Sequence, residues 1–156
     1  MIKLKQKIKD FDILLTGNKQ AKLSDYHGKY LVLYFYPKAS TPGCTTESCD
    51  FTELFPQFKK MNANILGVSI DSLKRQENFK DKYDFAFDLI ADTDEKVCQY
   101  FGVIQEKKNF GKTYMGIVRS TFILDDNGQL VKEWRNLRVK GHAQEVLESL
   151  ESIQNS

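Results

Sequence analysis

The sequence has few cysteines and prolines and no long hydrophobic run. Only three of each residue occur among 156 positions. Three cysteines are too few for the disulfide framework of a small secreted domain. No apolar run approaches the roughly 20 residues that a membrane-spanning helix needs. Residues 1–10 are polar and lysine-rich, without the apolar segment of a secretory signal. We therefore expect a cytoplasmic protein without a membrane partner.

An excess of charge of one sign is also missing. The chain has 23 lysines and arginines against 21 aspartates and glutamates, mixed along the sequence, and a net charge of +2. A clustered basic face is absent, so we expect no nucleic-acid partner. Hydrophobic residues make up 41% of the chain, which is typical of a globular protein. No repeat or flexible linker divides it, and we predict a single domain over residues 1–156.

The order of the predicted elements indicates an α/β fold. The apolar run at residues 31–36 is typical of a central strand buried on both faces. Further strands are predicted over 7–16 (a strand or hairpin), 65–70, 87–90, 116–124 and 129–135, and helices over 42–60, 72–83, 94–101 and 142–153. We expect residues 105–112 to form an exposed loop and Pro56 to kink or break its helix. This order fits a mixed sheet flanked by helices.

Cys44 lies where the buried strand leads into the first helix. Thr41 suits the N-cap of that helix and Pro42 its first position, which places Cys44 in the first turn. Free N–H groups and the positive end of the helix dipole stabilise a thiolate there. Because the thiolate is the nucleophile, we predict that Cys44 is reactive. The alternative is a small, buried and inert cysteine.

Cys49 follows Cys44 by five residues. In an unbroken helix their Cα atoms would lie roughly 8–9 Å apart, beyond the limit of about 7 Å for a disulfide. A bond between them therefore requires the first turns to unwind, which favours a transient disulfide over a structural one. A metal site is the other interpretation, with ligands from Cys44, Cys49, Cys98, His27 and His142, but their spacing matches no common zinc pattern.

The residues around Cys44 resemble a known active-site motif. Phe35-Tyr36-Pro37-Lys38 followed by Thr41-Pro42-Gly43-Cys44-Thr45 is similar to the Pro-x-x-x-Thr-x-x-Cys signature of peroxiredoxins. The run through Glu47 and Cys49 is similar to the peroxiredoxin Q group, also called bacterioferritin comigratory protein. Further similarities occur at residues 67–69, 100–103, 116–122 and 141–143, so the resemblance covers nearly the whole chain.

The resemblance implies a role for each signature residue. Cys44 would be the peroxidatic cysteine and Cys49 the resolving cysteine. Thr41 would hydrogen-bond the peroxide and the thiolate, and Pro37 would shield the pocket from water. Arg119 would supply positive charge to the thiolate and the bound peroxide. An attacking thiolate does need donors for the charge that moves onto the departing oxygen, and arginine is a permanent cation.

The implied protein is a thiol-dependent peroxidase that reduces hydrogen peroxide and organic hydroperoxides. Its Cys44 would become a sulfenic acid, Cys49 would convert this to an intramolecular disulfide, and thioredoxin or a similar dithiol reductant would reduce that bond. The implied fold is thioredoxin-like, a central mixed β-sheet flanked by helices with a peroxiredoxin-type N-terminal extension. Neither a cofactor nor a metal is implied, and the cysteine pair favours a monomer.

Two other functions remain open from the sequence. A thiol-disulfide exchange protein on the same fold would need a Cys-x-x-Cys pair, which the chain lacks. A redox sensor would use the cysteines only as a switch, and the fold alone does not exclude it. Cys98 lies in an apolar stretch and is predicted to belong to the core. Glu47 is predicted only to stabilise the first turns of its helix.

Overall fold

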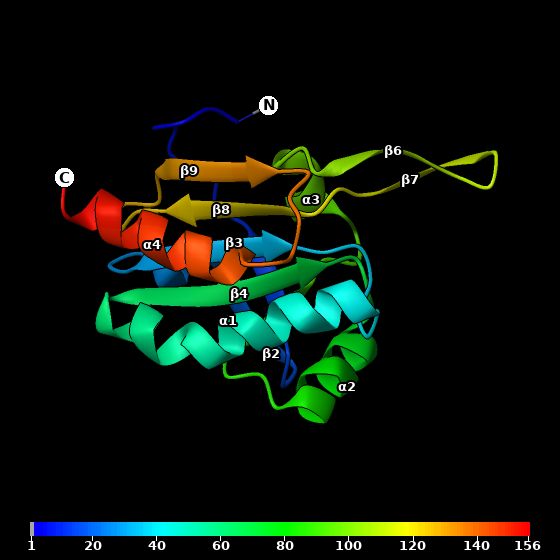
Figure 1. Cartoon of the computed structure of the whole chain (residues 1–156), viewed down its shortest axis with the longest axis horizontal. Helices are drawn as coiled ribbons and strands as arrows, with labels where there is room; N and C mark the ends of the chain where they lie inside the picture. Colours follow the sequence, from blue (N-terminus) through cyan, green and yellow to red (C-terminus); the bar gives the residue numbers. More distant parts are fainter. Residues whose placement is uncertain (1) are drawn as a thin grey trace.

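The structure is a computed structural model that describes residues 2–156. It contains a seven-stranded sheet in the order β2-β1-β5-β4-β3-β8-β9 and a separate hairpin of β6 and β7 (Figure 1). The strands are β1 (Asp12–Leu15), β2 (Lys19–Lys22), β3 (Tyr30–Phe35), β4 (Ala63–Ser69), β5 (Leu89–Ala91), β6 (Ile104–Asn109), β7 (Lys112–Ile117), β8 (Ser120–Leu124) and β9 (Leu130–Arg135). The helices are the short 3-10 helix η1 (Leu23–Tyr26), α1 (Pro42–Lys60), α2 (Leu73–Tyr83), α3 (Lys96–Tyr100) and α4 (His142–Gln154).

The sheet is mixed, as predicted. Strand β4 runs parallel to both β3 and β5, whereas β8 pairs antiparallel with β3 and β9. The β1–β2 hairpin adds two antiparallel strands beyond β5. Because β3, β4 and β5 are parallel, their carboxyl ends lie at one edge, where open α/β sheets usually carry their functional groups.

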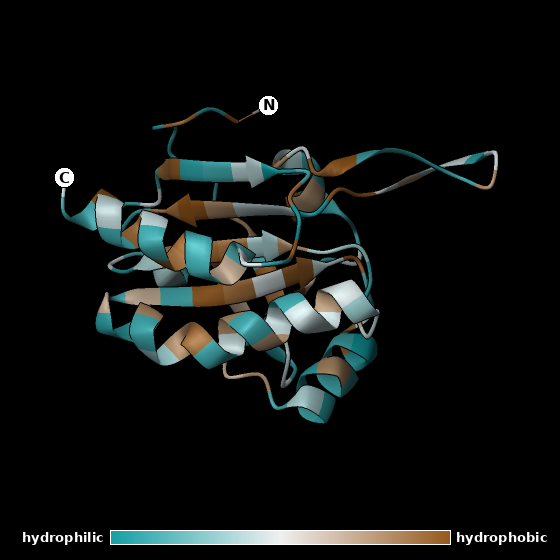
Figure 2. Cartoon of the chain, in the orientation of Figure 1, coloured by the Kyte–Doolittle hydropathy of each residue, from teal (hydrophilic) through white to brown (hydrophobic). Residues whose placement is uncertain are grey.

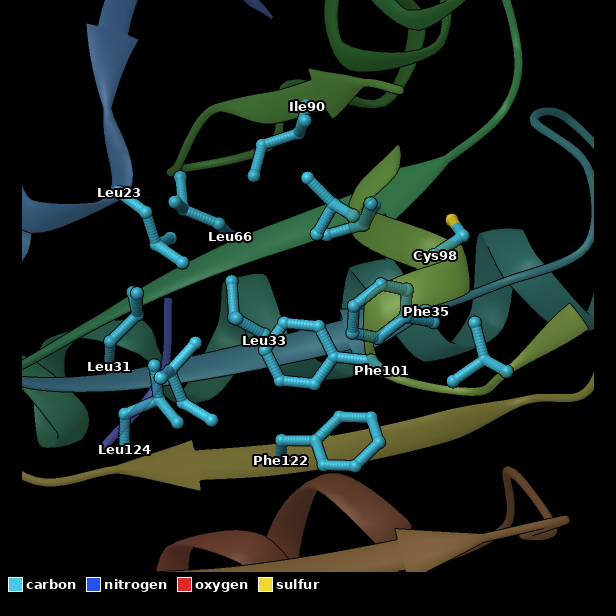
Figure 3. Close-up of a cluster of buried hydrophobic side chains, with 14 of the residues drawn as sticks. Leu23, Leu31, Leu33, Phe35, Leu66, Ile90, Cys98, Phe101, Phe122 and Leu124 are labelled. Atoms are coloured by element: carbon cyan, nitrogen blue, oxygen red, sulfur yellow. The ribbon is translucent and has the colours of Figure 1, made fainter. Parts of the chain in front are cut away.

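Strand β3 separates two hydrophobic clusters. Leu31, Leu33 and Phe35 point into the first, while Val32 and Tyr34 point into the second, which is the alternation expected of a strand buried on both faces. Figure 3 shows the first cluster, in which Phe101, directly after α3, packs against Phe35 of β3 and Phe122 of β8. The second cluster lies between the sheet and the helices α1 and α4.

Helix α1 lies against the sheet through the aromatic face that its sequence predicts. Phe51 and Phe58 are fully buried, and Leu54 and Phe55 pack partly against the same cluster. Figure 2 shows the hydrophilic residues of α1 and α4 alternating with apolar ones along each helix. The predicted break at Pro56 is wrong, because the helix continues to Lys60. Pro56 removes one backbone hydrogen bond, but Phe58 beyond it is fully buried and holds the last turn against the sheet.

Two further predictions are corrected around the hairpin. Residues 105–112 do not form a loop but belong to the β6–β7 hairpin. Its two antiparallel strands are paired from Ile104 opposite Ile117 to Asn109 opposite Lys112. Phe110 and Gly111 both have positive φ, as in a two-residue type I′ turn, and a phenylalanine at the first position hides the usual Asn-Gly signal. The strand predicted over 116–124 is divided, because β7 ends at Ile117 and β8 begins at Ser120. Within the described residues, no helix is long and apolar enough to cross a membrane.

We predict that Gly67→Ala strongly destabilises the fold. A Cβ atom at this position of β4 would lie 2.7 Å from Tyr34 Cζ and 2.8 Å from Leu89 Cδ2, and both side chains are fully buried. Such overpacking typically costs about 1–3 kcal/mol, which chemical denaturation measures. The matched control is Gly116→Ala, where the Cβ atom would meet only outer atoms of Lys107 and Tyr114 at 3.2 Å. Equal losses for the two variants would contradict the prediction.

Candidate active site

The loop after β3 delivers Cys44 to the start of α1. Thr41 is the N-cap, with extended backbone angles of φ −83° and ψ 155°, and Pro42 is the first helical residue. Cys44 therefore occupies the first turn, as predicted, and its side chain is fully buried. The free N–H groups of this turn favour a thiolate. The chain enters the helix through Ser40, which has a left-handed φ of +64°.

A buried carboxylate from the next strand fixes this loop. Asp71 follows β4, and its Oδ2 accepts hydrogen bonds of 2.7 Å from the backbone N–H of Ala39 and from the Ser69 hydroxyl. Hydrogen bonds to an ionised carboxylate are among the stronger ones in proteins. The carboxyl ends of β3 and β4 are thus joined directly in front of α1. Asp71 is not among the predicted site residues, although its place directly after a parallel strand is a sequence signal for such a role.

The interruption between β7 and β8 places Arg119 at the same edge. Ser120 is paired with Phe35 at the end of β3, so the preceding residue lies beside the loop that leads to Cys44. The carbonyl oxygen of Arg119 accepts a hydrogen bond of 3.1 Å from the N–H of Leu137. A continuous strand, as the sequence predicts over 116–124, would have kept Arg119 in a regular ladder. The interruption instead places Arg119 at the sheet edge, between the end of β7 and the start of β8.

The Arg119 guanidinium joins Cys44 to Glu47. Its Nη2 donates to Cys44 Sγ at 3.3 Å, and its Nη1 donates to Glu47 Oε1 at 2.7 Å. Only 17% of the arginine side chain is exposed, and 1% of the glutamate. Gly43 gives the guanidinium its room, because a Cβ atom there would lie 3.1 Å from Nη2. Charge-assisted contacts of this kind strengthen when they are shielded from water.

The prediction that Glu47 only stabilises the first turns of α1 is wrong, because its carboxyl group also binds the Arg119 guanidinium. Burial raises its pKa to about 7, although the charge and hydrogen bond of Arg119 act to lower it. Its second oxygen, Oε2, has no hydrogen-bond partner among the described residues. Burial acts to lower the pKa of Arg119, but the charges of Glu47 and Cys44 outweigh it and raise that pKa, so the guanidinium stays charged. The three-residue spacing from Cys44 is the sequence signal for this contact.

Thr41 and Pro37 lie in the loop that carries Cys44. The Thr41 hydroxyl donates its one proton to the carbonyl oxygen of Lys38 at 2.8 Å, so that proton is not donated to Cys44 as predicted. The lone pairs of the hydroxyl oxygen remain available to accept a hydrogen bond. Pro37 is half-buried and lines a groove with Ile70 and Asp71. The structure thus brings Cys44 and Arg119 into contact and keeps the other two residues within the adjoining loop.

The two remaining cysteines have different surroundings. Cys49 is a half-buried free thiol in α1, and burial, with the charge of Asp50, raises its pKa. Cys98 lies in the first hydrophobic cluster, which confirms the prediction of a core residue (Figure 3). Burial, together with the nearby charge of Asp92, raises the pKa of Cys98 strongly and keeps it a thiol. Within residues 2–156, no cluster of three His, Cys, Asp or Glu side chains is arranged to hold a metal.

This chain matches a known protein family. The family model described as "AhpC/TSA family" matches residues 4–133. The chain belongs to the AhpC/TSA family. It is 48% identical to Peroxiredoxin Bcp of Bacillus subtilis over 97% of both chains, and 51% identical to Peroxiredoxin Bcp of Xanthomonas campestris over 92% of this chain and 89% of that one.

Solved structures give the same assignment. The bacterioferritin comigratory protein of Xanthomonas campestris superposes with a TM-score of 0.87 at 50% identity and covers 91% of this chain and 90% of its own. A mutant of PrxQ from Xylella fastidiosa superposes with a TM-score of 0.95 at 40% identity, and the match covers 99% of this chain and 98% of that one. The thioredoxin-like fold and the resemblance to the peroxiredoxin Q group are confirmed. This peroxiredoxin is a thiol-dependent peroxidase.

The buried carboxyl of Glu47 makes stability depend on pH. Its pKa is about 7 in the folded protein against an ordinary value of 4.5. The Glu47 carboxyl therefore binds its proton more tightly in the folded state than in the unfolded state. The stabilisation that this proton provides is lost as the pH rises from 4.5 to about 7, so the free energy of unfolding falls over that range. Glu47→Gln should reduce that decline by roughly 1–3 kcal/mol, measured by denaturation across the range. The exposed Glu53→Gln variant is the control, and an unchanged slope in Glu47→Gln would contradict the prediction.

Proposed function

We propose that the peroxidase activity of this chain resides at Cys44, with Arg119 and Thr41 as its partners. The observation that supports this most directly is the contact between Arg119 Nη2 and Cys44 Sγ. In the first step the Cys44 thiolate attacks the outer oxygen of the hydroperoxide, and the O–O bond breaks. Cys44 is oxidised to a sulfenic acid, and the other oxygen leaves as hydroxide or alkoxide and takes up a proton.

The neighbouring residues have distinct parts in this step. Arg119 stabilises the thiolate and the charge that develops on the departing oxygen, since it is a permanent cation with several N–H donors. The Thr41 hydroxyl donates its hydrogen bond to the Lys38 carbonyl oxygen, so it would accept a hydrogen bond from the peroxide O–H. Pro37 keeps water from the loop side of the pocket. Glu47 holds the guanidinium in place through its bond to Nη1.

The second step requires part of α1 to unwind. Cys44 and Cys49 lie in one helix that runs unbroken over 19 residues. Helix geometry puts their Cα atoms roughly 8–9 Å apart, too far for a disulfide. The half-buried Cys49 also has a raised pKa while the helix is folded. Unwinding would bring the two sulfurs together and expose Cys49 to water. Its sulfur then attacks the sulfenic acid and releases water, leaving a disulfide.

The substrate and reductant follow from the same chemistry. The matching bacterioferritin comigratory protein of Xanthomonas campestris has alkyl peroxide reduction activity. We therefore infer that this chain reduces organic hydroperoxides, and hydrogen peroxide as well. A dithiol protein such as thioredoxin would reduce the Cys44–Cys49 disulfide by exchange. Because both cysteines belong to one helix, the cycle closes within one chain and a monomer suffices.

Cysteine variants test the cycle. Cys44→Ser should abolish peroxide reduction, because it removes the nucleophile. Cys49→Ser should still react once with peroxide, accumulate a dimedone-reactive sulfenic acid at Cys44, and lose turnover with thioredoxin. Cys98→Ala, at the buried core cysteine, is the control and should keep turnover. Unchanged turnover in Cys49→Ser would show that another thiol resolves the sulfenic acid.

The assignment of Arg119 is tested separately. Arg119→Met should lower the second-order rate constant with hydrogen peroxide by roughly 100- to 1000-fold, the usual effect of removing a donor to a developing oxyanion. Stopped-flow measurement of the first oxidation reports this constant without the reductant. The control is Arg138→Met, which removes an exposed arginine outside the site. A loss below about threefold in Arg119→Met would rule out the proposed role.

A further inference from the structure

The β6–β7 hairpin reaches the active site at its base. It projects from the body of the molecule (Figure 1), and β7 ends two residues before Arg119. In its register Lys107 lies opposite Tyr114, and Gln105 lies opposite Gly116. Side chains of one strand alternate between the two faces, so all four of these residues share a face of the hairpin.

Lys107 differs from the other lysines of the hairpin. Lys107 is half-buried, whereas Lys108 and Lys112 are exposed. A Cβ atom at Gly116 would lie 3.2 Å from Lys107 Cδ, so the lysine stem runs from its own strand toward residue 116. That direction leads away from the exposed tip and toward the base, where Arg119 follows. The missing side chain at Gly116 leaves the space that this path needs.

The surroundings of Lys107 include the active site. Partial burial is the main cause that lowers its pKa; the positive charge of Arg119 adds to this effect, and the charge of Cys44 opposes it. The influence of both residues on Lys107 agrees with the direction of its stem. Lys107 from β6 and Arg119 from the segment between β7 and β8 thus approach the same end of the hairpin, where Arg119 contacts the Cys44 sulfur.

The other ionisable groups around Cys44 do not replace Lys107. Tyr34 and Tyr36 come from β3 and the residue after it, and burial raises both pKa values, so they are neutral. Glu47 of α1 is bonded to Arg119 and offsets part of its charge. Lys107, by contrast, is a cation whose pKa the charge of Cys44 acts to raise.

We propose that Lys107 is a second cation of the active site, which acts with Arg119 to stabilise the Cys44 thiolate. Glu47 neutralises part of the arginine charge, and the lysine compensates for that loss. The role is electrostatic, because the ammonium group acts through its field and does not take part in bond formation. Gly116 positions it by leaving room for the stem. The inference rests on Cys44 as the reacting thiol.

The test uses the pH dependence of Cys44 reactivity. In a Cys49→Ser background, Lys107→Met keeps an unbranched stem of similar length but removes the charge. The pH midpoint of Cys44 alkylation should rise by about half a unit, and the rate with hydrogen peroxide below that midpoint should fall roughly threefold. Lys107→Arg should keep the parent midpoint. Gly116→Ala should shift it in the same direction by less, because it only displaces the lysine.

Lys108→Met is the matched control, since it removes an exposed charge from the same strand. An unmoved midpoint in Lys107→Met, or an equal shift in Lys108→Met, would overturn the proposal. An equal shift in Lys107→Arg would also overturn it, since packing rather than charge would then be responsible. Failure of the parent variant to react with peroxide, or reaction by Cys44→Ser, would instead refute Cys44 as the reacting thiol.

Discussion

The contact of the Arg119 guanidinium with Cys44 and Glu47 is the interaction on which the site depends. A buried cation of this kind is costly unless its charge is compensated, and a thiolate with a carboxylate can provide that compensation. Three features of the fold make the contact possible. Two residues separate β7 from β8, the loop before Cys44 is bonded to Asp71 at the end of β4, and Gly43 has no side chain. None of these features forms a bond with substrate, yet each limits where the guanidinium can lie.

Much of the fold could be predicted from the sequence because burial leaves a clear pattern. The apolar run of β3 and the aromatic spacing of α1 report what each segment packs against. The hairpin of β6 and β7 could not be predicted this way, because its strands are polar on most positions and its turn begins with Phe110. Pro56 did not end its helix, because the apolar face continues past it to the buried Phe58, and packing of that face against the sheet outweighs the one hydrogen bond that proline removes.

The site was predictable to the extent that a local motif defines it. Thr41, Pro42 and Cys44 form one helix start, so their arrangement follows from neighbouring residues alone. Arg119 could be predicted as a site residue only from the family resemblance. It lies 75 positions from Cys44 in the sequence, and no local sequence rule connects the two residues. Asp71, Glu47 and Lys107 depend on strand register and burial. Those quantities emerge only when the whole sheet has assembled.

The burial of Phe51 in α1 limits how far the proposed unwinding can extend. Its ring stacks on Tyr34 with a centroid distance of 4.8 Å and anchors the helix to the sheet. Residues 42–50, which precede it, contain both cysteines and end one position after Cys49. Phe51 thus marks the far end of the segment that unwinds in the proposed cycle. That segment also carries the buried side chains of Glu47 and Ser48, so each turnover would break the hydrogen bonds that join them to Arg119 and Tyr34 and form them again when the helix refolds.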